Sequence, residues 1–134
     1  MDPMSAFDMR KHPVHLGLGA TAETLPEFTG QPEWYAAYGA EHEADGNEGR
    51  LVSIHTFTES WDTWEMHPQG SELVLCTEGT MTLVQKIDGE HVSTVVTAGE
   101  AVINAPGVWH TAQVEERATA VFITAGVGTE MRPV

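Results

Sequence analysis

A series of short β-rich runs separated by turn residues occupies the sequence from Arg50 onward. Runs of this length and spacing are typical of an antiparallel barrel or sandwich rather than of alternating βαβ units. The Asp88-Gly89 pair between two runs is a strong signal for a type I′ hairpin turn, because both central positions need a positive φ. We therefore expect an all-β fold with strands at residues 51–58, 63–67, 72–77, 80–87, 91–97, 101–104, 109–114 and 119–124.

The N-terminal part of the chain lacks this regular spacing. It is mixed in composition and reads as an arm or edge element, which could include a short first strand between His12 and His15. A short helix is predicted from Pro32 to Ala44, because proline is tolerated in a first helical turn and a glycine follows the predicted end. We therefore expect an N-terminal arm with one short helix.

The length of 134 residues suits one hydrophobic core. We expect a single domain over residues 1–134, in which residues 1–48 form the arm and helix and residues 49–134 form the main barrel.

Charge and cysteine content narrow the class of protein further. With 6 basic and 20 acidic residues, the formal net charge of −14 disfavours both nucleic acid and anionic membranes as partners. No apolar run is long enough to span a bilayer or to form the centre of a signal peptide. Cys76 is the sole cysteine, which suits a reducing compartment and favours a buried apolar role over a catalytic thiol. We expect a soluble, cytoplasmic protein.

One segment concentrates polar side chains that could perform chemistry. Pro68 and Gly70 forbid a continuous helix, which leaves a strand, a tight turn and a returning strand. Glu65 and His67 are two residues apart, so both point to one face of the first strand, roughly 6 to 7 Å apart. Glu72 begins the returning strand beside them. These three side chains are therefore predicted to converge.

Two carboxylates and an imidazole on one face of an otherwise apolar strand pair are costly unless something neutralises them. A divalent cation does so directly, and this donor set suits Fe(II), Mn, Ni or Zn. A second imidazole is available from His110, which begins a strand just after the turn at residues 105–107. We therefore expect one divalent transition metal ion in the barrel.

The two segments resemble the paired motifs of the cupin superfamily, G-x5-H-x-H-x3,4-E-x6-G and G-x5-P-x-G-x2-H-x3-N. Glu65 stands where the first motif has its first histidine, and Val114 where the second has its asparagine. The resemblance implies a double-stranded β-helix, or jelly-roll, barrel and a homodimer. The residues that match the motifs are His67, Glu72, Gly79, Gly99, Gly107 and His110.

The role of Glu65 has three alternatives. It could bind the metal directly, accept a hydrogen bond from an imidazole that binds the metal, or act as an acid or base beside an open coordination position.

The lining of the predicted pocket follows from strand alternation. Val74 and Cys76 share the face of Glu72, and Ala112 shares the face of His110. Small apolar lining favours a compact, partly hydrophobic substrate. His55 could form a wall of this pocket, or could be a surface or packed histidine. Four other histidines have no motif support and are interpreted as surface residues: His12, His15, His42 and His91.

These expectations favour a metal-dependent enzyme that acts on a small organic molecule. Within the cupins, the resemblance implies a dioxygenase, isomerase or lyase. The alternative is a non-catalytic cupin that binds a small ligand as a sensor. Open coordination positions at the metal would discriminate the two, because a fully protein-ligated metal favours binding or structure over catalysis.

Overall fold

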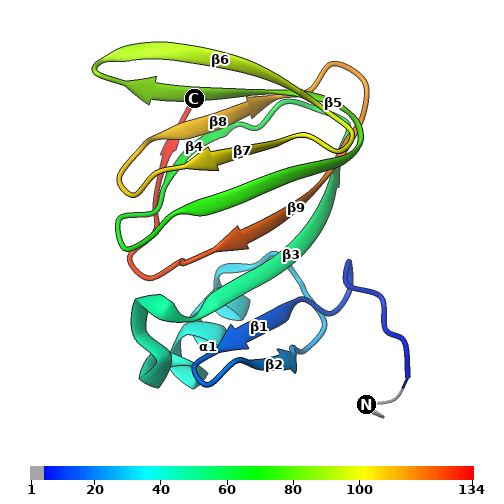
Figure 1. The fold of residues 1–134 in the computed structure, drawn as a ribbon, viewed down its shortest axis with the longest axis vertical. Coiled ribbons are helices and arrows are strands. Elements are labelled where there is room, and N and C mark those ends of the chain that lie inside the picture. Colours follow the sequence, from blue (N-terminus) through cyan, green and yellow to red (C-terminus); the bar gives the residue numbers. More distant parts are fainter. Residues whose placement is uncertain (1–4) are drawn as a thin grey trace.

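The computed structural model of the protein describes residues 5–134 and shows two antiparallel sheets that face each other (Figure 1). Sheet A has the strand order β2-β1-β3-β9-β5-β7, and sheet B has the order β10-β4-β8-β5-β6. The elements in chain order are β1 Val14–Gly17, β2 Thr21–Thr24, α1 Pro32–Glu41, the 3-10 helix η1 Glu43–Glu48, β3 Arg50–Phe57, β4 Thr63–Met66, β5 Glu72–Ile87, β6 Glu90–Thr97, β7 Ala101–Asn104, β8 His110–Gln113, β9 Ala118–Thr124 and β10 Glu130–Pro133.

The long strand β5 joins the two sheets. Its first half pairs with β7 and β9, and its second half pairs with β6 and β8. A register shift between Cys76 and Glu78 marks the crossing. Gly79 follows with φ +75°, and a Cβ there would lie 2.1 Å from the carbonyl oxygen of Arg117. The two runs predicted at residues 72–77 and 80–87 are therefore one strand, because this glycine lets the chain change sheets without leaving the ladder.

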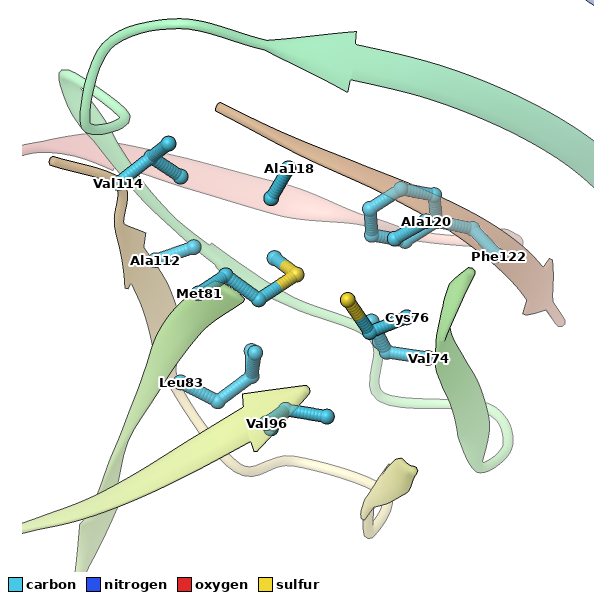
Figure 2. Packing of buried hydrophobic residues seen from close by; sticks show 10 residues of the cluster. All are labelled: Val74, Cys76, Met81, Leu83, Val96, Ala112, Val114, Ala118, Ala120 and Phe122. Atoms are coloured by element: carbon cyan, nitrogen blue, oxygen red, sulfur yellow. The ribbon is translucent and has the colours of Figure 1, made fainter. Parts of the chain in front are cut away.

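The core lies between the sheets and is built from the alternate, inward side chains of the strands. Cys76 is fully buried in it, as predicted. Figure 2 shows the cluster, whose members come from both halves of β5, from β6, β8 and β9, and from the residue that follows β8: Val74, Cys76, Met81, Leu83, Val96, Ala112, Val114, Ala118, Ala120 and Phe122.

The N-terminal elements extend sheet A beyond β3. His15 on β1 points to the inner side, where its Nδ1 lies 2.6 Å from the hydroxyl of Tyr38 on α1 and its Nε2 lies 2.6 Å from Oδ2 of Asp45 in η1. Gly49 leaves room for the ring, because a Cβ there would lie 2.8 Å from Cε1 of His15. The interpretation of His15 as a surface residue is therefore wrong: it is 3% exposed.

Most local predictions agree with the structure. Asp88 and Gly89 have φ values of 51° and 81°, which confirms the hairpin signal. Helix α1 ends at Glu41, earlier than predicted, because the backbone of His42 leaves the helical conformation, with φ −113° and ψ 15°; its N–H still donates to the carbonyl oxygen of Tyr38. Strands β2 and β10 were not predicted. Residues 1–4 of the predicted arm lie outside the described residues.

No helix within residues 5–134 combines the length and the apolar composition needed to cross a membrane.

Candidate metal centre

The structure brings together the polar side chains that the sequence singled out. Glu65 on β4 pairs directly with His110 on β8, which fixes these two residues side by side in sheet B. His67 follows the end of β4, and Glu72 is the first residue of β5. Residues from three strands and one turn therefore converge inside the barrel.

Short distances connect the group. The Nε2 atoms of His67 and His110 each lie 3.2 Å from an oxygen of Glu72, Oε2 and Oε1 respectively. Nε2 of His67 lies 4.0 Å from Oε2 of Glu65. Glu65, His67 and His110 each present one ligand atom within 4.8 Å of the others. Glu65 is the most open of the four, with 27% of its side chain exposed, whereas the other three are buried.

Hydrogen bonds at Nδ1, the ring nitrogen that does not face the carboxylates, set the orientation of both imidazoles. Nδ1 of His110 donates to the carbonyl oxygen of Val108 over 3.1 Å. The hydroxyl of Thr129 donates to the carbonyl oxygen of Gly126, so it accepts from Nδ1 of His67 over 2.8 Å. A neutral imidazole that carries its proton on Nδ1 has a free lone pair on Nε2. In the neutral form, both histidines therefore aim a nitrogen lone pair at the carboxylates.

The carboxylate of Glu72 is held by two further side chains. Nδ2 of Asn104 donates to Oε1 over 3.0 Å, and the hydroxyl of Thr124 donates to Oε2 over 2.6 Å. The amide of Asn104 is itself oriented by Gln85, whose Nε2 donates to its Oδ1 over 2.8 Å. Glu72 is thus fixed in position, and each oxygen keeps lone-pair capacity toward one imidazole.

The two carboxylates have opposite pKa shifts. Burial raises the pKa of Glu72, but the facing imidazoles of His110 and His67 lower it by more, so Glu72 stays ionised. Burial also raises the pKa of Glu65, and the charge of Glu72 raises it further. For His110, the favourable contact with Glu72 outweighs the opposite effect of burial and raises the pKa.

This donor set fits a divalent metal ion. The Nε2 atoms of His67 and His110 are buried and make no hydrogen bond. Leaving such atoms without a partner costs about 1–3 kcal/mol each. Two imidazole nitrogens and the carboxylate oxygens beside them match the ligands that several first-row transition metals prefer. The Glu–His–His cluster can therefore hold a metal.

The residues predicted to line a pocket lie on the strands that carry Glu72 and His110. Val74, Cys76 and Ala112 point inward and are fully buried in the apolar core. Figure 2 shows them pointing into the same volume as Met81 and Leu83. Their role as substrate contacts stays a prediction.

His55 also points into the barrel, from β3. Its ring lies among those of Phe28, Phe57 and Phe122, at centroid distances of 5.1, 6.2 and 5.9 Å. Burial lowers the pKa of His55, which favours the neutral ring. Phe28 lies in the connection between β2 and α1, so the N-terminal part of the chain contacts the interior of the barrel at this position.

Sequence reasoning missed the residues that hold the ligands in place. Asn104, Thr124 and Thr129 lie far from the first motif in sequence, and strand pairing brings Asn104 and Thr124 beside Glu72. For Asn104 and Thr124, the sequence offered one indication, which is their position in the alternation of side chains along the predicted strands. No pattern in the sequence pointed to Thr129.

The fold and the site together define a small antiparallel β-barrel with an internal histidine–carboxylate cluster. The sequence model of the cupin domain matches residues 56–126. This match spans more than half of the chain, and the protein therefore belongs to the cupin domain family, as the motifs predicted.

Solved structures agree with this assignment. An oxalate oxidase in complex with glycolate has a TM-score of 0.55 at 19% identity, over 70% of this chain and 50% of that one. A protein with a double-stranded β-helix domain from Klebsiella pneumoniae subsp. pneumoniae has a TM-score of 0.52 at 19% identity, over 63% and 74%. These similarities confirm the predicted double-stranded β-helix fold. No curated protein sequence matches the chain significantly.

Proposed function

We propose that this cupin is a metal-dependent enzyme that acts on a small organic molecule. The observation that carries the proposal is the pair of buried Nε2 atoms, of His67 and His110, which have no hydrogen-bond partner and face two carboxylates. Such an arrangement is unfavourable in an empty apolar barrel and favourable around a cation. The donor chemistry suits one ion of Fe, Mn, Ni or Zn.

Three side chains would hold this ion: His67, His110 and Glu72. Glu65 would either complete the ligand set or move a proton beside the ion. The ion, when bound, would polarise an oxygen atom of the substrate and orient it. Asn104 and Thr124 keep Glu72 in place through hydrogen bonds to both of its oxygens. Because Thr129 and the Val108 carbonyl fix the histidine rings, little reorganisation is needed on binding.

Glu65 is the side chain best suited to move a proton. It is the most exposed member of the cluster, and burial raises the pKa of its carboxyl group. A carboxyl group with a raised pKa is a better proton donor and acceptor at physiological pH than an ordinary glutamate. We propose that Oε2 of Glu65 carries this proton, in a reaction of the dioxygenase, isomerase or lyase type.

Metal analysis tests the site. The protein purified without an affinity tag is expected to bind about one equivalent of a transition metal, measured by elemental analysis after exchange against each candidate ion. His67→Ala is expected to lose most of this metal. The matched control is His91→Ala, which changes an exposed histidine on β6. Equal metal content in wild type and His67→Ala would refute the site assignment.

A substrate screen tests the activity. Metal-loaded protein is assayed with small carboxylic acids, including glycolate, since an oxalate oxidase of similar fold was solved with glycolate. Wild type is expected to turn over one class of compound, and Glu65→Gln is expected to bind metal but lose turnover. Calorimetric binding of a compound without any turnover would instead support the non-catalytic sensor.

A further inference from the structure

A small cavity lies in the N-terminal part of the molecule, lined by helix α1 and by the segment that follows β2. Figure 1 shows α1 beside β1 and β2, at one end of the molecule. None of the lining residues belongs to the metal cluster, so the cavity is a separate feature of the fold. Its volume is about 80 Å³, and its lining consists of Leu25, Pro26, Trp34, Ala37, Tyr38 and Glu41.

The aromatic side chains of α1 do not serve a core. No residue of this helix is buried, although Trp34, Tyr35 and Tyr38 are aromatic, and large aromatic side chains normally dominate the buried face of a helix. Trp34 and Tyr38 are one helical turn apart. Their rings are nearly parallel, with an interplanar angle of 12° and centroids 5.8 Å apart. These two rings therefore give the cavity an aromatic wall.

Hydrogen bonds at the polar tips hold both rings in place. Nε1 of Trp34 donates to the carbonyl oxygen of Pro26 over 3.3 Å, and the hydroxyl of Tyr38 lies 2.6 Å from Nδ1 of His15. Because the polar atoms already have these partners, the carbon atoms of the rings are what remains to contact a ligand. The wall is thus fixed before a ligand binds, which lowers the entropic cost of binding.

Glu41 gives the cavity its charge, since it is the one charged residue of the lining. A cation is attracted both by a carboxylate and by the aromatic rings of Trp and Tyr. An anion would instead face the Glu41 carboxylate on a chain whose net charge is −14. The lining therefore favours a cation.

The size and polarity of the cavity narrow the kind of cation. A water molecule takes up about 30 Å³ in the liquid, so the cavity holds a group of only a few heavy atoms. A bare metal ion would find a single carboxylate there, which is fewer oxygen ligands than such ions require. A methylated ammonium group combines a positive charge with an apolar surface, and both match the lining.

We propose that this cavity binds the head group of a quaternary or methylated ammonium compound, in contact with the rings of Trp34 and Tyr38 and beside the carboxylate of Glu41. The metal cluster takes no part in this site. The proposal therefore does not rest on the proposed function of the barrel.

Two small probes of similar shape test the role of charge. Tetramethylammonium chloride carries a positive charge, whereas tert-butanol has a similar branched apolar surface and none. An NMR titration follows the indole N–H of Trp34 and the backbone amides of α1, with sodium chloride as the control for ionic strength. Tetramethylammonium is expected to bind with a dissociation constant of about 1–10 mM. The alcohol is expected to bind at least about fivefold more weakly.

Either of two results with the wild-type protein would overturn the proposal. Equal affinities for both probes would show that charge plays no part in binding. The absence of saturable shifts in α1 up to about 100 mM tetramethylammonium would show that the cavity does not bind this class of compound.

A matched pair of glutamate substitutions locates the charge. Glu41→Gln is expected to weaken the binding of tetramethylammonium at least about fivefold, because it removes the carboxylate beside the cavity. Glu33→Gln removes another exposed carboxylate of α1, about two turns earlier and outside the lining, and is expected to change the binding less than about twofold. Equal weakening in both variants would mean that the overall negative charge attracts the cation, and would overturn the proposed site.

Trp34→Leu tests the aromatic wall. It keeps an apolar side chain but removes the ring, and it is expected to weaken the binding of tetramethylammonium at least about fivefold, measured on the remaining amides of α1. Far-UV circular dichroism reports whether the variant is folded. A folded Trp34→Leu variant that binds as tightly as wild type would overturn the proposal, and an unfolded one leaves Glu41→Gln, at an exposed position, to decide it.

Discussion

The side-chain amide of Asn104 donates a hydrogen bond of 3.0 Å to Oε1 of Glu72 on the paired strand. Asn104 is almost fully buried, and Gln85 orients its amide from the other side. Asn104 is therefore a positioning residue for Glu72 rather than a candidate metal ligand.

Removing this amide is expected to weaken metal binding. Asn104→Ala leaves one oxygen of Glu72 without its donor, and loss of such a partner typically lowers metal affinity by about 10–100-fold. Competition of each variant with a chelating dye measures the affinity. Gln113→Ala changes an exposed amide on β8 and serves as the control. Equal affinities in Asn104→Ala and wild type would show that Thr124 alone suffices to hold Glu72.

Gly79 is expected to be the glycine least tolerant of substitution. A Cβ at this position would meet the backbone oxygen of Arg117 at 2.1 Å, in addition to the strain of φ +75°. Gly79→Ala is expected to lower the free energy of unfolding by at least about 3 kcal/mol, from positive-φ strain together with overpacking.

Gly89 provides the matched comparison for this substitution. It has a similar φ of +81°, but nothing lies within 4 Å of a Cβ built there. Gly89→Ala is therefore expected to cost only the strain, about 1–2 kcal/mol. Urea unfolding measures both variants. Similar losses would mean that the backbone around Arg117 relaxes and that the close contact contributes little.

The sequence correctly predicted those structural features that depend only on residues adjacent in the chain. Strand alternation placed Val74 and Cys76 inward, and the positive-φ requirement located the turn at Asp88. The sequence-based predictions failed for features that depend on contacts between distant parts of the chain. The short, exposed strands β2 and β10 exist because β1 and β4 offer them an edge. The break predicted before residue 80 is instead a crossing between sheets.

The residues of the candidate site likewise fall into those that the sequence predicted and those that it did not. Motif spacing predicted His67, Glu72 and His110, and the structure brings them together with Glu65. Asn104 contacts Glu72 only because β7 pairs with β5 in one register, which no local pattern encodes.

His15 shows how tertiary contacts can reverse a local interpretation. It has no motif neighbour in sequence, yet Tyr38 and Asp45 come from separate helices to bury it and to bond both of its ring nitrogens. A histidine without a motif therefore need not be a surface residue.

Tyr38 is expected to make stability depend on pH in the alkaline range. Burial, with the charges of Asp45 and Glu23, raises the pKa of Tyr38 to about 12. In the unfolded chain the pKa is about 10. Between these values the folded protein keeps the phenol proton and the unfolded chain loses it. The free energy of unfolding contributed by Tyr38 is therefore complete below pH of about 10 and falls as pH rises toward about 12.

Tyr38→Phe isolates this contribution. The variant lacks the hydroxyl that contacts His15 and is expected to be less stable than wild type at pH of about 8, by about 1 kcal/mol. Its stability should then decline less steeply than that of wild type between pH of about 10 and 11.5, because no phenol titrates at this position. Urea unfolding across this range measures both slopes. Parallel curves would mean that Tyr38 titrates equally in the folded and unfolded states, and that burial and the nearby carboxylates do not raise its pKa.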